Sequence, residues 1–464
     1  MAGQAHAIAV CIAFGCSGSS RPVPLPVPSP SPTVEVVQPS TSDTVVLHAL
    51  DVELGTVGDL ASKGPRFEDR VRRYRAFVRD RLTQDAFFKT FLVRLFPNLF
   101  SEDSGAAVPL TLQTGQFHGA PFYYLDKPCA PPDLVNVRPW WDDAHDVAIC
   151  KDSYRPELTV DQRTGSSVSI FCEYYWLPSV ESRPRVCRCG ARLLSCARDE
   201  QQAAALASAM SAEPRLTTAA IVRSHQPFSR ILTSEETVRS GLADFIYNRS
   251  EFYRSGKFEL AADRPAGWHP REAAFGGGIL STAHTMFLFD SQRVIGGWIW
   301  EDFLCIPLRS TDVHASQMFQ MKSANFRHAG HMDLAEMEGC RTCHARLENV
   351  LQVFAPVTPV KHGIRFDLDA KPLSAKFFGT DDSDQRGEGP ATFAWLGEMI
   401  TKQPEFKSCI VKKVEDLVYG GLEIPADVHT TLASRFAEGM DLARLFEDSV
   451  VARYLGYPAL AIAR

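Results

Sequence analysis

The segment from about Arg66 to Phe100 carries apolar and aromatic residues at helical spacing, with Arg and Asp between them. This period places the apolar residues on one face of a helix, and Pro97 with Asn98 ends the pattern. The apolar positions are Phe67, Val71, Tyr74, Phe77, Val78, Leu82, Phe87, Phe88, Phe91, Leu92, Leu95 and Phe96. We therefore predict helices here, with the aromatic stripe in a hydrophobic core and not around a cofactor.

The segment between Cys129 and Cys196 has a different pattern. Polar and apolar residues alternate from Ser167 to Cys172, and a period of two with β-branched residues is typical of a strand. The same segment holds five clustered aromatic residues, Trp140, Trp141, Tyr174, Tyr175 and Trp176. We expect a loop-rich, partly β insert in which these rings are buried beneath disulfides. The alternative is that they contact a polysaccharide or a partner protein.

Helical patterns return from Asp199 onward. Residues 201–210 are rich in Ala, the strongest helix former. Pro227 begins a loop that we expect to lead into a helix capped by Thr233 or Ser234. Near the C-terminus, helices are predicted over 393–400, 406–417 and 432–445.

A run of three glycines, Gly276 to Gly278, interrupts the helical patterns. It lacks the spacing of a phosphate-binding loop and a preceding strand. The run instead predicts a close approach of two backbones or a hinge, because glycine has no side chain to obstruct either.

Composition narrows the class of protein. The 464 residues are 45% hydrophobic and 22% charged, with a net charge of −6, which is ordinary for a globular protein. No basic excess is present, so we expect no binding of nucleic acid. After the first residues, no apolar run approaches the length that spans a bilayer.

The N-terminus is similar to a bacterial lipoprotein signal. A short apolar core over 7–14 precedes Gly15, Cys16 and Ser17, although no Lys or Arg precedes the core as is usual. A Pro- and Ser-rich segment follows, which predicts an extended tether. We expect an exported lipoprotein with lipid on Cys16, facing the periplasm or cell surface. The outer membrane is favoured because Ser17, and not Asp, follows the Cys. A merely disordered N-terminus is the alternative.

Cysteine usage agrees with export. Apart from Cys11, Cys16, Cys340 and Cys343, eight cysteines remain: Cys129, Cys150, Cys172, Cys187, Cys189, Cys196, Cys305 and Cys409. An even remainder in an oxidising compartment predicts disulfides, whose pairing the sequence does not give. The alternative for the tight cluster at 187–196, with Cys172, is a metal site.

The motif Cys340-Arg341-Thr342-Cys343-His344 carries the sharpest chemistry in the chain. Cys-x-x-Cys-His is the attachment pattern of c-type haem. Positions i, i+3 and i+4 of a helix share one face, so both thiols and the imidazole can reach one macrocycle. Two alternatives stay open, a disulfide beside an uninvolved histidine and half of a zinc site, although no second ligand pair follows downstream.

Several segments resemble, in order, the planctomycete-type cytochrome c proteins, a family of large exported bacterial proteins. They are RILTS at 230–234, DFIY at 244–247, GILS at 278–281, EDFLCIPL at 301–308, GCRTCHARLE at 339–348 and FKSCIVKKV at 406–414. The resemblance implies haem c on Cys340 and Cys343, with His344 on the iron. Family members usually continue with Asp-Pro-x-Gly, where this chain has Glu348-Asn349-Val350-Leu351.

The second axial ligand of the iron is not determined by the sequence. Candidates are Met318, Met321, His328, His331, Met332, Met337 and His362. His331 and Met332 rank first because they lie on the approach to the motif, together with His362, which follows it, and an open five-coordinate iron is the alternative.

These patterns predict a mainly α, multi-domain helical protein with a disulfide-rich, partly β insert. The predicted division is 1–16 signal, 17–45 linker, 46–128 helical domain, 129–198 Cys-rich insert, 199–300 helical domain, 301–354 haem-attachment segment and 355–464 C-terminal helical domain.

Two functions of different classes follow from these predictions. The first is a haem lipoprotein that exchanges single electrons with an unknown redox partner. The alternative is a disulfide-stapled surface protein for binding or assembly, without haem. No motif names a hydrolase nucleophile or a metal-bound base, and whether the chain is an enzyme stays open.

Overall fold

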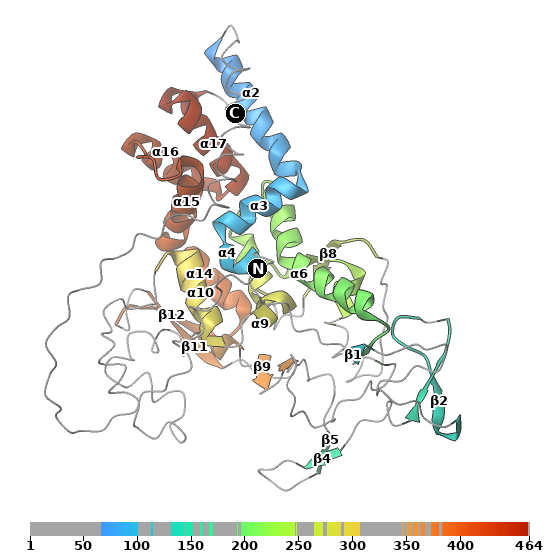
Figure 1. Cartoon of the computed structure of the whole chain (residues 1–464). Helices are drawn as coiled ribbons and strands as arrows, with labels where there is room; N and C mark the ends of the chain where they lie inside the picture. The colour runs from blue at the N-terminus through green and yellow to red at the C-terminus, as the bar shows by residue number, and fades with distance from the viewer. Residues whose placement is uncertain are drawn as a thin grey trace, which may run out of the picture.

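A computed structural model describes residues 66–100, 113–114, 131–142, 144–151, 158–160, 167–169, 193, 196–245, 247, 264–271, 276–288, 292–306, 346, 350, 352–354, 357–360, 363–366, 373–379 and 383–462. This part of the chain is mostly helical with small sheets, as the sequence predicts (Figure 1). No helix in it is long and apolar enough to cross a membrane.

The first helical region confirms the prediction for residues 66–100. It forms α2 (Phe67–Thr83), α3 (Asp85–Leu95) and α4 (Pro97–Phe100). On α2, Val71, Tyr74, Val78 and Leu82 are each at most 4% exposed. This three-to-four-residue spacing builds the buried face that the sequence pattern predicts.

The second region begins with the long helix α6 (Glu200–Arg223), whose N-cap Asp199 accepts a hydrogen bond from the backbone of Gln202. The predicted helix after Ser234 is wrong. A short helix, α7 (Arg230–Thr233), ends there, and strand β7 (Glu236–Arg239) follows. Ser234 Oγ does accept a backbone N–H, but from Glu236 at 3.2 Å, which closes a turn instead of a helix N-terminus.

The central region contains η5 (Gly278–Ser281), α9 (Ala283–Leu288) and α10 (Gln292–Leu304). The glycine run before it makes the close approach that the sequence predicts. Gly278 has φ +57, and a Cβ there would lie 2.1 Å from the carbonyl oxygen of Ile231. At Gly277, with φ +126, a Cβ would lie 2.6 Å from the Cβ of Phe393. Only glycine fits at both positions.

The C-terminal region contains α14 (Phe393–Lys402), α15 (Pro404–Tyr419), α16 (Ala426–Gly439) and α17 (Leu442–Leu455), then η7 (Tyr457–Ala461). α14 and α15 confirm the helices predicted over 393–400 and 406–417. The single helix predicted over 432–445 is wrong, because Met440 adopts the left-handed conformation and Asp441 caps α17. Because the C-cap of α16 is followed directly by the N-cap of α17, the chain changes direction between these two helices.

The described strands form six two-stranded sheets. Five pairs are antiparallel: β2 (Leu134–Val137) with β3 (Val147–Cys150), β4 (Leu158–Val160) with β5 (Ser167–Ser169), β7 with β8 (Gly267–Pro270), β9 (Val357–Val360) with β10 (Gly363–Phe366), and β11 (Ser374–Phe378) with β12 (Gln385–Pro390). The short pair β1 (Gln113–Thr114) with β6 (Cys196–Ala197) is parallel. The predicted strand over 167–172 is confirmed in its first three residues, as β5.

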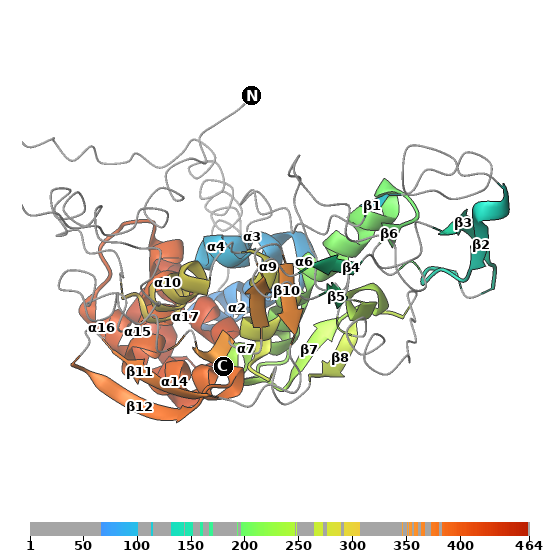
Figure 2. The same ribbon diagram turned by 90° about the horizontal axis from the view of Figure 1, so that it is seen from below.

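The sheets lie around the helices and not at their centre. The β2–β3 hairpin stands at one end of the molecule, and β11 and β12 lie beside α14 (Figures 1 and 2). The predicted partly β character of the insert therefore agrees with the structure in β2 to β5, whereas the two hairpins over 357–390 were not predicted.

Four phenylalanines join the helical regions into one core. Phe96, Phe228, Phe303 and Phe406 come from four separate segments, and all are at most 1% exposed. Their rings form a chain of contacts with centroid separations of 5.5 to 6.4 Å. Aromatic pairs in this range add to the stabilisation from burial. The N-terminal and C-terminal helices thus share one hydrophobic core.

Candidate functional site

The residues predicted to bind haem lie outside the described part of the chain. These are Cys340, Cys343 and His344, the candidate second ligands His331, Met332 and His362, and the lipidation candidate Cys16. The structure does describe the residues that follow the motif and the core on which they pack.

The segment after the motif is anchored in the hydrophobic core. Arg346 and Val350, two and six residues after His344, are helical and 3% and 0% exposed. Val353 is also fully buried, within the turn η6 (Gln352–Phe354). Spacings of four and three residues place these side chains on one helical face. That face meets β11 and α14, which η6 contacts.

Two buried hydrogen-bond donors lie at the end of β11. Trp300 of α10 is fully buried and stacks on Phe377 at a centroid separation of 5.2 Å. Its indole Nε1 has no hydrogen-bond partner among the described residues. Arg346 Nη1 donates to the carbonyl oxygen of Gly379 across 3.5 Å. Trp300 thus packs on β11, and Arg346 bonds to the backbone of the residue directly after β11.

A disulfide joins the residue directly after α10 to α15. Cys305 and Cys409 are bonded, with Cα atoms 5.3 Å apart. One turn further along α15, Lys413 Nζ pairs with Asp302 at 3.2 Å and donates to the carbonyl oxygen of Leu95. The prediction of disulfides is confirmed for this pair, and Cys150 is disulfide-bonded as well. The disulfide and the Lys413–Asp302 ion pair hold the C-terminal end of α10 against α15.

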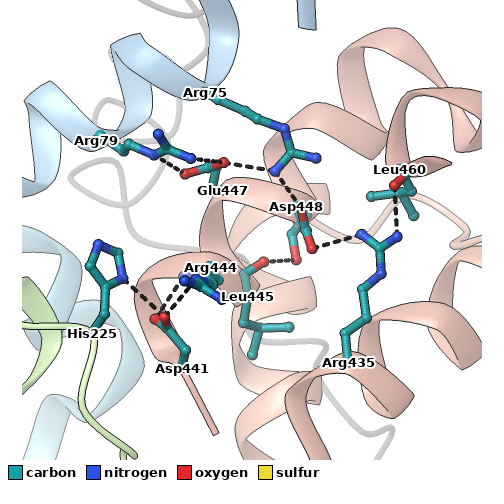
Figure 3. Close-up of polar contacts among 11 residues, drawn as sticks. Arg75, Arg79, His225, Arg435, Asp441, Arg444, Leu445, Glu447, Asp448 and Leu460 are labelled. Atoms are coloured by element: carbon teal, nitrogen blue, oxygen red, sulfur yellow. Dashed lines mark hydrogen bonds and ion pairs between the residues drawn. The ribbon is translucent and has the colours of Figure 1, made fainter. Parts of the chain in front are cut away.

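A network of buried ion pairs fixes α2 to α17 (Figure 3). Arg75 Nη1 donates to Glu447 at 2.7 Å and to Asp448 at 2.6 Å. Arg79 adds two hydrogen bonds to Glu447, and Arg435 of α16 donates to the other oxygen of Asp448 at 3.0 Å. Burial alone would lower the pKa of Arg75, but its hydrogen bonds to both carboxylates outweigh this and raise the pKa.

A small crevice of about 190 Å³ opens beside this network, between α16 and α17. Arg435, Asp441, Arg444 and Asp448 line it. Each of these groups already has a partner: Asp441, for example, accepts from His225 at 2.9 Å and pairs with Arg444 (Figure 3). The charged groups that line the crevice are therefore already paired, as expected of a network that stabilises the fold.

A second polar cluster holds β7 and α9 against α6. Glu213, fully buried on α6, accepts from Thr237 at 2.6 Å and from the Tyr247 hydroxyl at 2.5 Å. Tyr247 in turn accepts from the backbone of Ala283, and Arg271 lies 3.9 Å from its ring centroid. Burial raises the pKa of Tyr247, so the phenol stays protonated as a donor. Both carboxylate oxygens of Glu213 and the hydroxyl of Tyr247 are thus engaged in hydrogen bonds with other described residues.

Two further titratable groups are buried away from these clusters. His284 of α9 is 7% exposed and bonds through Nε2 to the carbonyl oxygen of Leu99 at 3.2 Å. Burial lowers its pKa. Glu415 of α15 is 3% exposed, and burial raises its pKa although His429 lies 2.9 Å away. Within the described ranges, no three His, Cys, Asp or Glu side chains converge as metal ligands.

The Cys-x-x-Cys-His motif was predicted from the sequence, whereas the contacts of Trp300 and Arg346 around β11 were not. Trp300 was not a predicted site residue, and Arg346 belonged only to the segment that carries the resemblance. One signal was available: Arg346, Val350 and Val353 follow the motif at spacings of four and three, which is the pattern of a buried helical face. The expected burial of the insert's aromatic residues is confirmed for Trp140, which packs on Phe245, whereas Tyr174, Tyr175 and Trp176 lie outside the described residues.

The chain was compared with known proteins in three ways. No protein-family model matches it, and neither the curated proteins nor the solved structures gave a match.

Proposed function

We propose that the chain is a c-type haem protein that transfers single electrons. Cys340 and Cys343 form the thioether bonds, and His344 is the proximal ligand of the iron. The observation that carries the proposal is the Cys-x-x-Cys-His motif, together with two buried helical residues that follow His344 by two and six positions, Arg346 and Val350. A reactive disulfide loop on the surface would not need such an anchor.

The residues around this segment fit a haem. When bound, haem supplies a one-electron couple whose potential depends on the axial ligands, burial and hydrogen bonds. Val350 and Val353 hold the segment after the motif against β11 and α14. Trp300 of α10 and Phe377 of the same strand, β11, form a fully buried aromatic stack. His331, Met332 and His362 remain the proposed second ligands.

Export of the protein belongs to the same proposal. The Cys305–Cys409 disulfide supports it, because structural disulfides form in oxidising compartments. We propose a lipid anchor on Cys16, a Pro-rich tether and a globular body facing the periplasm or cell surface, favouring the outer membrane. A Cys16→Ser variant should stay uncleaved or leave the membrane fraction. Wild-type protein found in the cytoplasm with Met1 intact would contradict both export and haem attachment, since attachment of this kind follows export.

The test of haem binding uses the full chain, expressed in a host with haem-attachment machinery. Wild-type protein should retain haem through acid-acetone extraction and on a denaturing gel. The Cys340→Ser Cys343→Ser variant should lose it, whereas the matched Cys305→Ser Cys409→Ser variant should keep it. Wild-type protein without haem, but with a Cys340–Cys343 disulfide, would overturn the proposal. A His344→Ala variant should keep covalent haem but change its spectrum.

One structural observation bears on the alternative of a binding or assembly protein without haem. That alternative relies on exposed rings in the Cys-rich insert. Trp140 is only 2% exposed, and its ring lies 4.0 Å from that of Phe245, centroid to centroid. A buried Trp contributes to packing and not to a binding surface, which argues against Trp140 as a contact residue in that alternative.

A further inference from the structure

We propose that three arginines at the start of α2 bind an anionic phospholipid surface. These residues, Arg66, Arg70 and Arg73, are called the arginine face below. The inference rests on the proposed lipid anchor at Cys16, to which it adds a second contact between the protein and its membrane. Anionic headgroups attract each arginine that comes close to the bilayer surface.

The arginine face lies on one side of α2. Its members follow one another at spacings of four and three residues, which places side chains on the same side of a helix. The backbone N–H of Arg70 donates to the carbonyl oxygen of Arg66 across 3.3 Å, so these two residues are one turn apart. Val71 and Val78, each at most 1% exposed, pack into the core from a different side of the helix. Arg66 and Arg73 are exposed, and Arg70 is partly exposed.

The charges of the arginine face are not balanced within the described part of the chain. No carboxylate of a described residue pairs with any of the three guanidinium groups, and that of Arg70 lies 5.3 Å from the ring centroid of Phe67. Other arginines of the same helix do have acidic partners: Arg72 pairs with Asp69, and Arg75 pairs with Glu447. The arginine face therefore differs from its neighbours in having charge available for an external anion.

This arrangement is unfavourable for the helix by itself. Like charges three and four residues apart repel each other, and the N-terminal end of a helix favours acidic side chains over basic ones. A local arrangement that costs stability without a gain in packing is typical of a functional surface. The whole chain has a net charge of −6, whereas residues 66–83 contain seven arginines and three acidic residues. An anionic surface therefore attracts this end of the protein and repels the rest, which orients the molecule.

The position of α2 favours a lipid surface over a diffusing acidic protein. α2 lies at one end of the described part of the molecule, far from the β2–β3 hairpin (Figure 1). Arg66 follows the proposed lipidated residue Cys16 by 50 positions, and a chain of that length reaches at most about 170 Å. The anchor thus keeps the arginine face within range of one membrane. Tethering raises the effective concentration of the surface, so that a weak electrostatic contact is sufficient.

The test measures vesicle binding of the full-length Cys16→Ser chain, which carries no lipid at that position. It should sediment with vesicles in which a third of the lipid is phosphatidylglycerol, and bind them more tightly than vesicles of phosphatidylcholine alone. Salt at about 1 M, where the Debye length is about 3 Å, should abolish the difference. Replacing all three residues of the arginine face with Gln should weaken binding to the anionic vesicles about fivefold for each arginine, or about a hundredfold in total. Replacing them with Lys should preserve most of the binding, because the charge is kept.

The matched control is Arg138→Gln Arg198→Gln Lys402→Gln, which changes the net charge equally at positions 49%, 53% and 66% exposed. It should weaken binding much less, and circular dichroism should show wild-type helix content in every variant. Equal binding to the two kinds of vesicle, or a loss in the control as large as that in the arginine-face variant, would overturn the proposal. Mass spectrometry of wild-type protein tests the lipid anchor separately: a chain without an acyl group contradicts the anchor, whereas the vesicle result for Cys16→Ser does not depend on acylation.

Discussion

Replacing Arg75 with Met should weaken the attachment of α2 to α17 and lower the free energy of unfolding. The side chains of Arg75, Glu447 and Asp448 are only 4%, 2% and 2% exposed in their contacts. Met keeps the apolar stem of Arg75 and removes the charge together with two hydrogen bonds of 2.7 and 2.6 Å. The two carboxylates stay buried, which makes this substitution more costly than one at an exposed ion pair.

The magnitude follows from what each carboxylate retains. Breaking a buried ion pair by removing one partner costs about 3–5 kcal/mol. Glu447 keeps both hydrogen bonds from Arg79, and Asp448 keeps its bond from Arg435. Neither is left without a cation, so we expect a loss of about 3 kcal/mol, at the lower end of that range.

The matched control is Arg72→Met on the same helix. Arg72 is 64% exposed and pairs with Asp69, one turn away, so its loss should stay below about 0.5 kcal/mol. Both variants are compared with wild type by equilibrium urea unfolding, followed in parallel by circular dichroism and Trp fluorescence. Added salt should leave the difference intact, because buried pairs are little screened. Unfolding free energies for the two variants that agree within error would refute the role given to this network.

Three further predictions concern other parts of the core. His284 has a lowered pKa, so its contribution to stability is present above its ordinary value of about 6.5 and is lost as the pH falls through the folded-state pKa. Unfolding curves at pH 7 and pH 5 should show less acid destabilisation for His284→Phe than for wild type. Removing the disulfide in Cys305→Ala Cys409→Ala should cost about 2–5 kcal/mol, and non-reducing peptide mapping of wild type should recover the bridged fragment. Gly278→Ala and Gly420→Ala start from the same φ, +57 and +58, but a Cβ has open space only at the second. Gly420→Ala should lower the free energy of unfolding by about 1–2 kcal/mol. Gly278→Ala should lower it clearly more, which the denaturation midpoints measure. Equal losses would contradict the close contact of Gly278 with α7.

Helices with a repeating apolar face could be predicted from the sequence. α2 and α15 were predicted because their buried positions recur every three or four residues. The helix predicted after Ser234 failed for a physical reason: the Ser hydroxyl that caps a helix also closes a turn. Which of the two forms depends on contacts far away in sequence, such as Val238 N–H donating to Thr217 on α6.

Other features could not have been predicted because they arise only in three dimensions. β12 contains Gly387 and Gly389, which disfavour a strand, yet a Cβ at either would collide with the side chains of Met399 or Trp395 on α14. The same holds for the candidate site. The motif was visible locally, whereas the stacking of Trp300 on Phe377 joins residues that are distant in sequence.

The central claim is that haem is attached through two thioether bonds. The most direct measurement is the reduced pyridine haemochrome spectrum of full-length protein after acid-acetone extraction, because the position of its α-band reports how many vinyl groups are saturated. We predict the band of a haem with both vinyls bonded, at one haem per chain, shifting toward a singly bonded haem in Cys340→Ala. A chain that gives no band after extraction, from a host that attaches haem to a reference cytochrome, would contradict the account.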